Sequence, residues 1–323
     1  KLLTDRFYPF ALFKYELNYR TVSKRAVRNF FADDAPCDYI IFQELGVAEY
    51  YFKRCEKYPK TKGIKTMLII HSEDDSGSML LETFKGYGRK DMEKRFRKRR
   101  DFVYKHIDKV MYISRKAYEN SIMPEGKRTY AYNGSPVMEF SPQNMNDGIV
   151  QFVCIGTIDG RKGQDKILEA LHLMDQKHLE RLHVTFVGGG TKESETKRMA
   201  EELGVSQYVT FTGRRNDVPE ILRRMDVFIM PSTVEGLPMS AIEAMRAGLY
   251  LILTDTGGNA ELCEEGCGAV CTRDAGDIMS VMCQVMDGTT LSDNQKMNSH
   301  DRFMRQFSLE CMAKGYEEAL KTL

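Results

Sequence analysis

The sequence predicts an α/β protein with two Rossmann-like domains whose parallel sheets face a cleft. Three observations predict this class. Short apolar runs alternate with helical stretches over most of the chain, as in parallel sheets with helices on both faces. A length of 323 residues is enough for two domains of about 150 residues each. The breaker-rich segment Ser-Pro-Gln-Asn-Met-Asn-Asp-Gly at 141–148 separates the halves, so we expect domains at 1–145 and 146–323.

The second half shows the alternation most clearly. Its expected strands are Val150–Ile155, His183–Val187, Val209–Phe211, Val227–Met230, Tyr250–Leu253 and Gly268–Cys271. Its expected helices are Asp165–Leu173, Ser194–Leu203, Val218–Arg224, Pro238–Ala247, Asp293–Arg305 and Leu309–Leu323.

The first half has weaker signals of the same type. Its expected strands are Tyr39–Phe42, Lys65–Ile70, Lys109–Ile113 and Thr129–Tyr132, and its expected helix is Lys90–Lys105. The chain begins at Lys1 rather than at a Met and shows no clear first strand. We therefore expect the first domain to be incomplete, with its opening strands absent.

Composition excludes several classes of function. A net charge of +1 gives no global attraction to nucleic acid, and no apolar run is long enough to span a membrane. Neither a secretory signal nor disulfide-framework density among the eight cysteines is visible, so a cytoplasmic protein is expected. Cys263, Cys267 and Cys271 are evenly spaced, but no histidine lies nearby. Buried packing is therefore expected for them rather than a metal site.

Two carboxylates, Glu235 and Glu243, lie eight residues apart across an expected turn and helix start. Gly236 and Pro238 favour the turn. Both carboxylates, with the free N–H groups of the helix start, are expected beyond the C-terminal end of a strand, where open α/β sheets bind ligands. This geometry suits a ligand with many hydroxyls and a phosphate. An alternative for Glu243 is a capping box with Ser240, in which it bonds only its own helix.

Lys162 and Gly163 lie between the strand that ends at Ile155 and the helix from Asp165. A cation at a helix N-terminus favours a bound phosphate, and Arg161 adds a second charge. A solvated basic turn is the alternative. His71 follows the strand Lys65–Ile70, so it is either a ligand-edge residue or an ordinary polar loop residue.

Other nucleotide motifs are weak or missing. Gly188-Gly-Gly190 follows a strand, but no G-x-G-x-x-G and no P-loop is present, which argues against a dinucleotide oxidoreductase or an NTPase. No Asp-x-Asp pair is present to hold a metal-bound nucleotide. The basic run from Lys90 to Lys105 is either a solvated helix or a peripheral contact with an anionic inner membrane face or a lipid-diphosphate acceptor.

Taken together, these residues resemble the retaining glycosyltransferases of family 4, which have the GT-B fold. The resemblance covers most of the chain and depends on an ordered set of short motifs. In the second half they are Ile155-Gly156, Lys162-Gly163, Val187-Gly-Gly-Gly190, Phe211-Thr-Gly213, Met225-Asp-Val227, Pro231-Ser-Thr-Val-Glu-Gly236, Glu243-Ala-Met-Arg-Ala-Gly248 and Thr256-Gly-Gly258 with Asn259-Ala-Glu261. In the first half, Tyr132-Asn-Gly134 matches the Asn-Gly before the interdomain linker.

The resemblance implies a nucleotide-sugar donor held mainly by the second domain. Glu243 would bind ribose hydroxyls. Glu235, with the amides of Gly236, Leu237 and Met239, would hold the transferred sugar and its phosphate; Pro238, in the same loop, has no N–H. Further implied positions are Lys162 at the diphosphate, His71 near the donor sugar, and Gly213, Arg214 and Arg215 beside the base. No cofactor and no metal is implied, because Lys162 would neutralise the leaving group.

Two departures stand out. The family often has Arg directly after the glycine of the first strand, as a second cation at the diphosphate, and this chain has Thr157 there. Arg161 would supply this second cation from a nearby position. The glycine-rich loop of the first domain's opening strand has no counterpart in this chain.

The resemblance as a whole implies retaining, metal-independent sugar transfer to a glycan or lipid-linked acceptor in surface polysaccharide assembly. The alternatives are a non-catalytic GT-B subunit that partners an active transferase and, less well matched to the two glutamates, another GT-B enzyme such as an epimerase.

Overall fold

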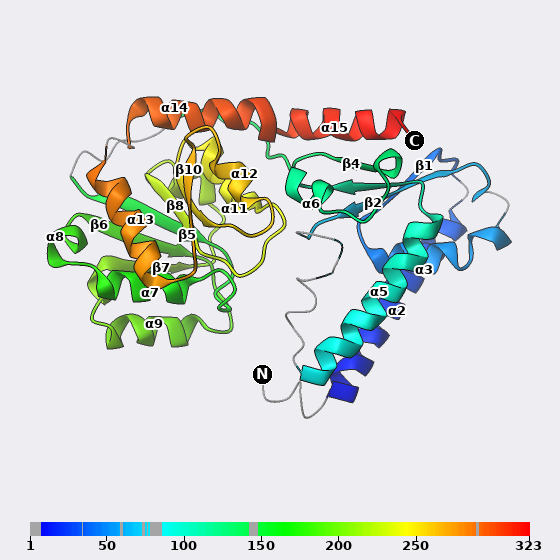
Figure 1. Ribbon diagram of the computed structural model, residues 1–323, viewed down its shortest axis with the longest axis horizontal. Helices are drawn as coiled ribbons and strands as arrows, with labels where there is room; N and C mark the ends of the chain where they lie inside the picture. The colour runs from blue at the N-terminus through cyan, green and yellow to red at the C-terminus, as the bar shows by residue number, and fades with distance from the viewer. Residues whose placement is uncertain are drawn as a thin grey trace. The chain divides into compact units, whose positions relative to one another are not determined.

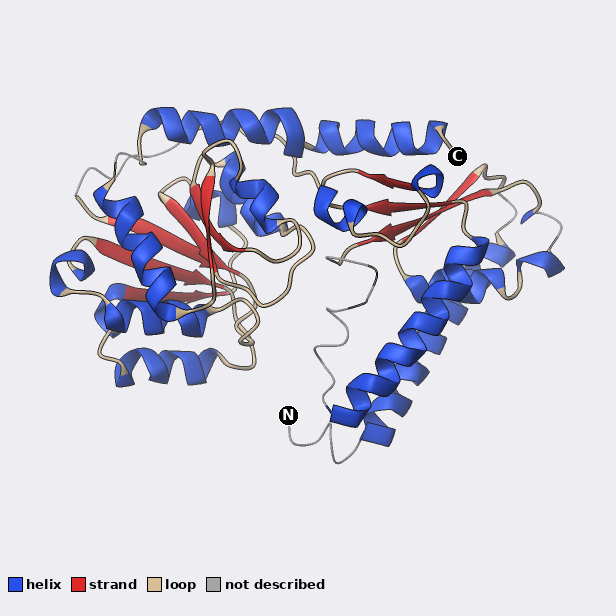
Figure 2. Cartoon of the chain, viewed as in Figure 1, coloured by secondary structure: helices blue, strands red, loops and turns tan. Residues whose placement is uncertain are grey.

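The computed structural model describes residues 8–33, 35–58, 61–72, 75, 77, 86–141, 148–288 and 291–323. The chain divides into two compact units, Lys1–Ala131 with Lys314–Leu323 and Tyr132–Ala313. Each unit contains one sheet of parallel strands (Figures 1 and 2). This confirms the predicted α/β class with two parallel sheets.

The first unit contains a four-stranded sheet in the order β1-β2-β3-β4. Its elements are α2 (Tyr8–Ala32), β1 (Tyr39–Phe42), α3 (Leu45–Phe52), β2 (Lys65–Ile70), α5 (Gly86–His106), β3 (Lys109–Tyr112), α6 (Arg115–Glu119) and β4 (Arg128–Tyr130). The four expected strands are confirmed. Helix α2 was not expected, and it packs on α3, where Phe31 stacks on Tyr51 with ring centroids 6.0 Å apart.

The second unit contains a six-stranded sheet in the order β10-β9-β8-β5-β6-β7. Its strands are β5 (Val150–Ile155), β6 (Leu182–Val187), β7 (Val209–Gly213), β8 (Val227–Met230), β9 (Tyr250–Thr254) and β10 (Gly268–Cys271). Its helices are α7 (Gln164–Leu173), α8 (Gln176–Leu179), α9 (Glu193–Glu202), α10 (Val218–Leu222), α11 (Met239–Arg246), α12 (Asn259–Cys263), α13 (Ala275–Asp287) and α14 (Asp293–Arg302). All six expected strands are confirmed.

The core of the second unit has helices on both faces of the sheet. On one face Phe152 and Phe186 pack among buried residues of α7, α9 and α13. Because side chains alternate along a strand, Val153 and Phe228 point to the opposite face, where α11, α12 and α14 contact β9. Figure 1 shows α7, α9 and α13 grouped on one side of this sheet. The two layers fix the strand ends from which the candidate site is built.

The limits of the units differ from the division expected at residue 145. Residues after Ala131 pack within the second unit: the buried Arg246 donates to the Ser135 hydroxyl at 2.9 Å and to the Pro136 carbonyl at 3.0 Å. Helix α15 (Leu309–Lys321) contributes its last residues to the first unit. There Lys109 Nζ donates to the Thr322 carbonyl at 2.8 Å. These contacts join segments far apart in sequence, so a local run of breakers could not show them.

Within the described residues, no helix combines the length and the apolar character that a bilayer crossing requires.

Candidate active site

The site lies where the direction of the chain through the second sheet reverses. Strands β5 and β8 are neighbours, with Phe152 opposite Val227. Strands β6 and β7 continue the sheet beyond β5, and strands β9 and β10 continue it beyond β8. Open α/β sheets bind ligands at such a switch point, beyond the carboxyl ends of the strands. The loops that follow β5 and β8 carry Lys162 and Glu235. Topology therefore places the two residues at the same edge.

The two loops approach each other at Gly163. This glycine has a φ of +81°, and a Cβ built on it would lie 2.2 Å from the Pro231 carbonyl oxygen. Only glycine tolerates both the conformation and the contact. Gly163 is also the N-cap of α7, so the close approach brings the start of α7 against the loop of Glu235.

Three predicted residues contact one another in these loops. Lys162 Nζ lies 2.7 Å from Glu235 Oε1, and Arg161 NH1 lies 3.3 Å from the same oxygen. Glu235 is 4% exposed, and a buried carboxylate requires such partners. Arg161 also donates to the Val234 carbonyl at 3.2 Å. The cations and the carboxylate thus form one partly desolvated cluster.

Backbone donors lie beside this cluster. Within the described residues, the N–H groups of Gly236, Leu237, Met239 and Ser240 donate no hydrogen bond to the protein. Free N–H groups at a helix start attract anions and hydroxyl oxygens. Pro238 has no N–H, and it begins α11 as its N-cap with φ −72° and ψ 123°. The loop therefore presents unpaired donors next to two cations.

Glu243 lies on α11 and is half-buried. The helix is capped by Pro238 without any side-chain hydrogen bond, so the capping-box alternative for Ser240 and Glu243 is wrong. The helix begins one residue before Ser240, which places that serine inside the first turn rather than at the cap. Burial raises the pKa of Glu243, and the nearby Arg246 guanidinium partly opposes the rise. The carboxylate is left available to a ligand.

The glycine-rich loop after β6 packs against the loop after β5. A Cβ at Gly190 would lie 2.2 Å from the Ile158 carbonyl oxygen, and Gly188 donates its N–H to the Gly213 carbonyl at 2.8 Å. These glycines therefore allow close packing, and Gly213 ends β7 beside them. A Cβ at Gly189 would lie 3.6 Å from Cγ of Arg214, so this exposed arginine lies next to the loop.

Thr157 and Arg215 also lie outside the ion cluster. Thr157 is exposed after β5. Arg215 is exposed and pairs with Asp217, with Nε 2.8 Å from Oδ1. This pairing raises the pKa of Arg215 and lowers the pKa of Asp217.

His71 belongs to the first unit, directly after β2. Its Nε2 lies 2.6 Å from Gln43 Oε1. Because an amide oxygen only accepts, Nε2 carries the proton in this contact and Nδ1 keeps a lone pair. Surrounding protein atoms partly desolvate the imidazole and lower the pKa of His71. The ring is thus a neutral hydrogen-bonding group near pH 7.

Arg273 is a site-edge residue that the sequence reasoning missed. Its Nε donates to the Pro231 carbonyl at 2.9 Å, and its NH2 donates to the Gly160 carbonyl at 3.3 Å. It therefore ties together the loops that carry Lys162 and Glu235. A signal was available, because Arg273 follows β10 by two residues and so lies at the same carboxyl edge of the sheet.

The evenly spaced cysteines lie in the interior of the second unit. Cys263, Cys267 and Cys271 are buried. Burial raises the pKa of Cys263 and of Cys271 to about 12. Among the described residues no group of three or more His, Cys, Asp or Glu side chains is arranged to hold a metal ion. Their environment agrees with the expected packing role.

A family model described as glycosyl transferases group 1 matches residues 139–299, which include the two loops and α11. The chain carries a glycosyl transferases group 1 domain. Within it lie all the second-half motifs of the predicted resemblance, including those that contain Lys162, Glu235 and Glu243. The resemblance is therefore confirmed at the level of the family.

Curated relatives match about a third of this chain. The lipopolysaccharide glucosyltransferase WaaG of Escherichia coli is 34% identical over 117 residues, which cover 36% of this chain and 31% of WaaG. A GDP-mannose-dependent phosphatidylinositol monomannoside mannosyltransferase of Mycobacterium tuberculosis is 33% identical over 118 residues, 34% of this chain and 30% of the enzyme. The matched region thus spans less than a third of each relative's length.

Solved structures extend the likeness to both units. HepE of Anabaena, in complex with UDP, matches 94% of this chain and 82% of HepE, with a TM-score of 0.75 at 16% identity. The structure of the glycosyltransferase WaaG matches 86% of this chain over 83% of the WaaG chain, with a TM-score of 0.62 at 18% identity. At this identity the likeness shows the fold alone. It confirms the predicted GT-B class.

Proposed function

We propose that this protein transfers a sugar from a nucleotide-sugar donor to a glycan or lipid-linked acceptor, with retention of anomeric configuration and without a metal ion. The observation that carries the proposal is the buried Glu235 carboxylate in contact with Lys162 and Arg161, at the switch point of a glycosyl transferases group 1 domain. A charge cluster beside free backbone donors suits a ligand that combines phosphates with hydroxyls.

Lys162 is the proposed partner of the leaving diphosphate. Its ammonium has three hydrogens, and Glu235 takes one of them at 2.7 Å, so two remain for phosphate oxygens. Arg161 shares the same carboxylate oxygen and adds a second positive charge. The cluster would stabilise the negative charge that grows on the diphosphate as the bond to the sugar breaks. In this proposal the two cations take the place of a metal ion.

Glu235 and Glu243 are assigned different parts of the donor. Glu235, with the N–H groups of Gly236, Leu237 and Met239, would hold the transferred sugar and its phosphate. Glu243, one helix turn into α11, would accept hydrogen bonds from ribose hydroxyls. Gly213, Arg214 and Arg215 would border the base. His71 would hydrogen-bond near the donor sugar as a neutral imidazole, and no protein nucleophile is required.

The relatives support the class of donor and leave the base open. HepE binds UDP, whereas the mannosyltransferase is named as dependent on GDP-mannose. The name of WaaG assigns it to lipopolysaccharide, which supports surface polysaccharide assembly as the setting of this protein.

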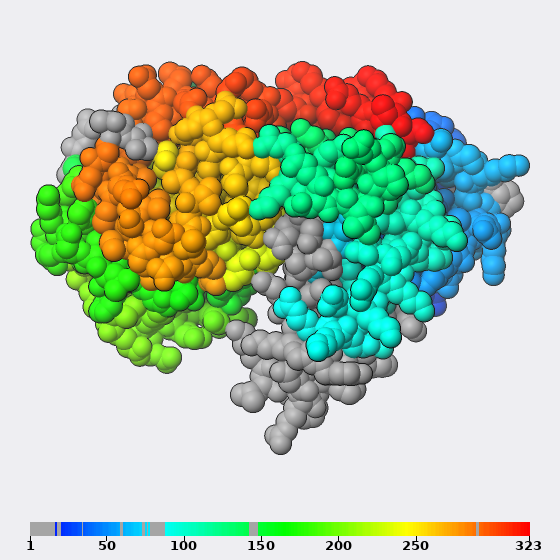
Figure 3. Space-filling model, viewed as in Figure 1, coloured from blue at the N-terminus to red at the C-terminus, as the bar shows by residue number. Residues whose placement is uncertain are grey.

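Helices α2 and α5 support a peripheral contact with an anionic membrane face. Helix α5 has nine cationic and three acidic side chains. Helix α2 has five cationic side chains and one acidic side chain. The two helices therefore carry charges of +6 and +4 in a chain whose net charge is +1. The surface of α5 is visible as cyan atoms in Figure 3. Clustered cations of this kind bind acidic headgroups, and a lipid-linked acceptor would be found there.

Thermal-shift measurements test the proposal directly, because a ligand that binds the folded state raises its apparent stability. The protein is titrated with UDP, GDP, ADP and their sugars, with and without EDTA. We expect one nucleotide series to raise the melting temperature equally in both conditions. Loss of the effect with EDTA would contradict metal independence, and no effect from any nucleotide would contradict the donor assignment.

A transfer assay separates the enzyme from a binding subunit. The bound donor is incubated with membrane-derived acceptors, and sugar incorporation is measured. Binding without incorporation in the presence of the intact acceptor pool would favour the non-catalytic GT-B subunit, for which Thr157 in place of the usual arginine is the specific observation.

A further inference from the structure

Two adjacent residues at the start of the second unit reach the loop that carries Glu235. Tyr132 and Asn133 directly follow the last residue of the first unit's main segment, Ala131. Neither is part of a helix or strand. Both are half-buried, and both side chains donate a hydrogen bond within the second unit. The partner of Asn133 is Leu237 in the loop from Glu235 to Met239, and the partner of Tyr132 is Glu261 on α12.

Asn133 fixes the C-terminal flank. Its Nδ2 donates to the Leu237 carbonyl at 3.0 Å. The peptide group from Leu237 to Pro238 is planar, and the proline ring restricts the next φ, which is −72° here. Only the ψ angle of Pro238 is then free between the anchored carbonyl and the N–H of Met239. One hydrogen bond therefore sets the direction of the unpaired donors at the start of α11.

Tyr132 acts on the N-terminal flank through α12. Its hydroxyl donates to Glu261 Oε2 at 2.8 Å. Helix α12 follows Gly257 and Gly258, and Gly258 donates its N–H to the Gly236 carbonyl at 2.7 Å. A Cβ at Gly257 would lie 2.3 Å from the Glu235 carbonyl oxygen. The backbone at these glycines is therefore in close contact with the loop. The position of α12 therefore affects the peptide group between Gly236 and Leu237, whose N–H is one of the unpaired donors.

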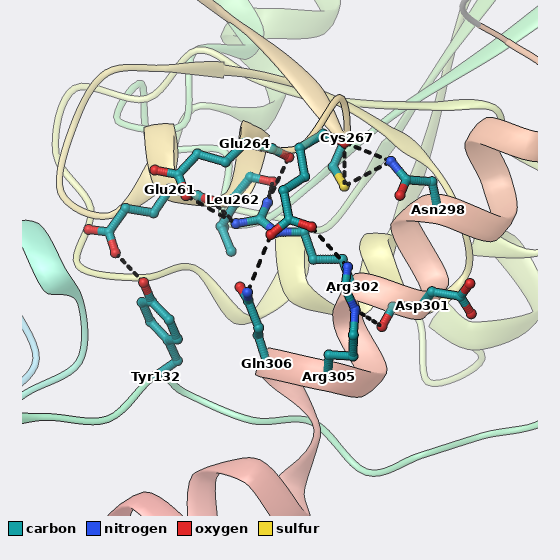
Figure 4. A network of polar contacts seen from close by, with 11 residues as sticks. Tyr132, Glu261, Leu262, Glu264, Cys267, Asn298, Asp301, Arg302, Arg305 and Gln306 are labelled. Carbon is teal, nitrogen blue, oxygen red and sulfur yellow. Dashed lines mark hydrogen bonds and ion pairs between the residues drawn. The ribbon is translucent and has the colours of Figure 1, made fainter.

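Arg302 holds the other end of the same helix. It is 1% exposed, and its guanidinium donates to the carbonyls of Glu261, Leu262 and Glu264 at 2.6, 2.9 and 2.9 Å. Figure 4 shows this guanidinium among the carbonyls, with Tyr132 directed at the Glu261 carboxylate. A cation at a helix C-terminus stabilises its unpaired carbonyls. Helix α12 is thus fixed at both ends and forms a firm support for the loop.

We propose that Tyr132 and Asn133 are positioning residues that hold the Glu235–Met239 loop with its free N–H groups directed at the donor. The inference rests on the proposed function, because the loop is assigned to the sugar and its phosphate. Neither residue touches the donor in this proposal. Asn133 acts on the loop directly and Tyr132 acts on it by way of α12.

The test compares Asn133→Ala and Tyr132→Phe with a matched control, Asn298→Ala. Asn298 Nδ2 donates to the Glu265 carbonyl at 2.7 Å, so the control loses the same kind of bond in the same unit, away from the loop. Calorimetry measures the affinity for UDP, UDP-glucose and uridine, and for GDP, GDP-mannose and guanosine. Hydrogen exchange is followed without ligand in the peptide that covers residues 241–258, because Ala241 and Ile242 donate their N–H groups to the Pro238 carbonyl at 3.2 Å and Gly258 donates its N–H to the Gly236 carbonyl at 2.7 Å.

For Asn133→Ala we expect faster exchange in this peptide and about tenfold weaker binding of the diphosphate and the nucleotide sugar, the loss of about one hydrogen bond. Nucleoside binding should not change, and Tyr132→Phe should act in the same direction less strongly. The control should lose as much thermal stability without either effect. A purely structural role would weaken all ligands together.

Three outcomes would overturn the inference. In Asn133→Ala, hydrogen exchange and diphosphate affinity could equal those of the wild type, or nucleoside and diphosphate could lose affinity equally. The third outcome is that Asn298→Ala shows the same changes as Asn133→Ala. Should Asn133→Ala fail to fold, Tyr132→Phe, which removes a single oxygen, decides by the same criteria. If the wild type binds no nucleotide but exchange still rises in the variants, the proposed function fails and the positioning role remains.

Discussion

In the second unit charged side chains converge on a buried loop, whereas in the first unit they spread over exposed helices. Glu235 is 4% exposed and lies within 3.3 Å of two cations. On α5, by contrast, Lys94, Arg97 and Lys98 are exposed and have no ion-pair partner among the described residues. Desolvated charges act strongly on a small ligand at fixed geometry, while exposed charges attract a large surface additively and are screened by salt. The comparison suggests that the two units recognise different kinds of anion.

The largest effect is expected when the exposed charges are removed. Lys94, Arg97 and Lys98 lie on one face of α5 at spacings of three and four residues, so we replace all three by Gln. Each cation near an anionic bilayer contributes about 1 kcal/mol, so binding to phosphatidylglycerol vesicles should fall roughly a hundredfold or more. Cosedimentation measures it, with phosphatidylcholine vesicles as the neutral reference.

The matched control replaces Lys177, Lys197 and Arg198, three exposed cations of the second unit. It should leave vesicle binding almost unchanged. Equal losses in both triple variants would mean that total charge, rather than the α5 surface, attracts the bilayer. Unchanged nucleotide affinity in the α5 variant would sharpen the contrast between the units.

The next effect concerns the buried cluster. Lys162→Ala should weaken nucleoside diphosphate binding by about 10- to 100-fold, the value of a charge-assisted hydrogen bond of roughly 1.5–3 kcal/mol. Nucleoside binding should stay constant. Titration calorimetry with UDP, GDP and the free nucleosides measures both. Lys166→Ala, which removes a half-buried ion pair to Glu169 within α7, is the control, and equal losses for diphosphate and nucleoside would remove the assignment.

A smaller effect is expected at Glu243. Glu243→Gln should weaken donor binding about tenfold, because a hydrogen bond to a charged acceptor is stronger than one to a neutral acceptor by roughly 1.4 kcal/mol. Urea unfolding should change little, since the side chain caps no helix. A large stability loss with intact donor affinity would contradict the ribose assignment.

The raised pKa of Glu243 also gives a pH dependence with a definite sign. Since the folded pKa lies above the usual value, of about 4.3, the carboxylate becomes protonated earlier as the pH falls. Protonation removes the negative charge of the carboxylate that accepts the ribose hydrogen bonds. Donor affinity should therefore weaken as the pH falls through the range above the usual pKa. The same ionisation makes folding less favourable as the pH rises through that range. Affinity measured against pH should lose this step in Glu243→Gln.

The smallest effect is expected at His71. Because the side chain is exposed and makes one hydrogen bond to Gln43, His71→Ala should leave stability unchanged. Loss of one neutral hydrogen bond of about 1 kcal/mol should lower donor turnover roughly fivefold. The rate of sugar release from the bound donor measures it, with Gln43→Ala as the companion variant. A loss of nucleotide affinity in His71→Ala would place the residue at the diphosphate instead of the sugar.

The strands were predictable because each is a compact apolar run between turn residues. Helix α13 was missed although its signals are local: Asp274 accepts from the N–H groups of Gly276 and Asp277, and Ile278, Met282 and Val285 share one buried face. Helix α2 was missed for a physical reason. Its contacts with α3, such as Phe31 on Tyr51, are tertiary.

The sequence by itself determined which residue types follow each strand: Lys162 and Gly163 after β5, Glu235 after β8, and a helix start after the second loop. Only the tertiary structure decided that these loops meet. Strand order depends on the packing of the whole sheet, and β5 and β8 are neighbours although β6 and β7 lie between them in the chain. The contacts of Asn133 with Leu237 and of Tyr132 with Glu261 also span more than a hundred residues. Local periodicity contains no record of such partners, so only the folded chain can show them.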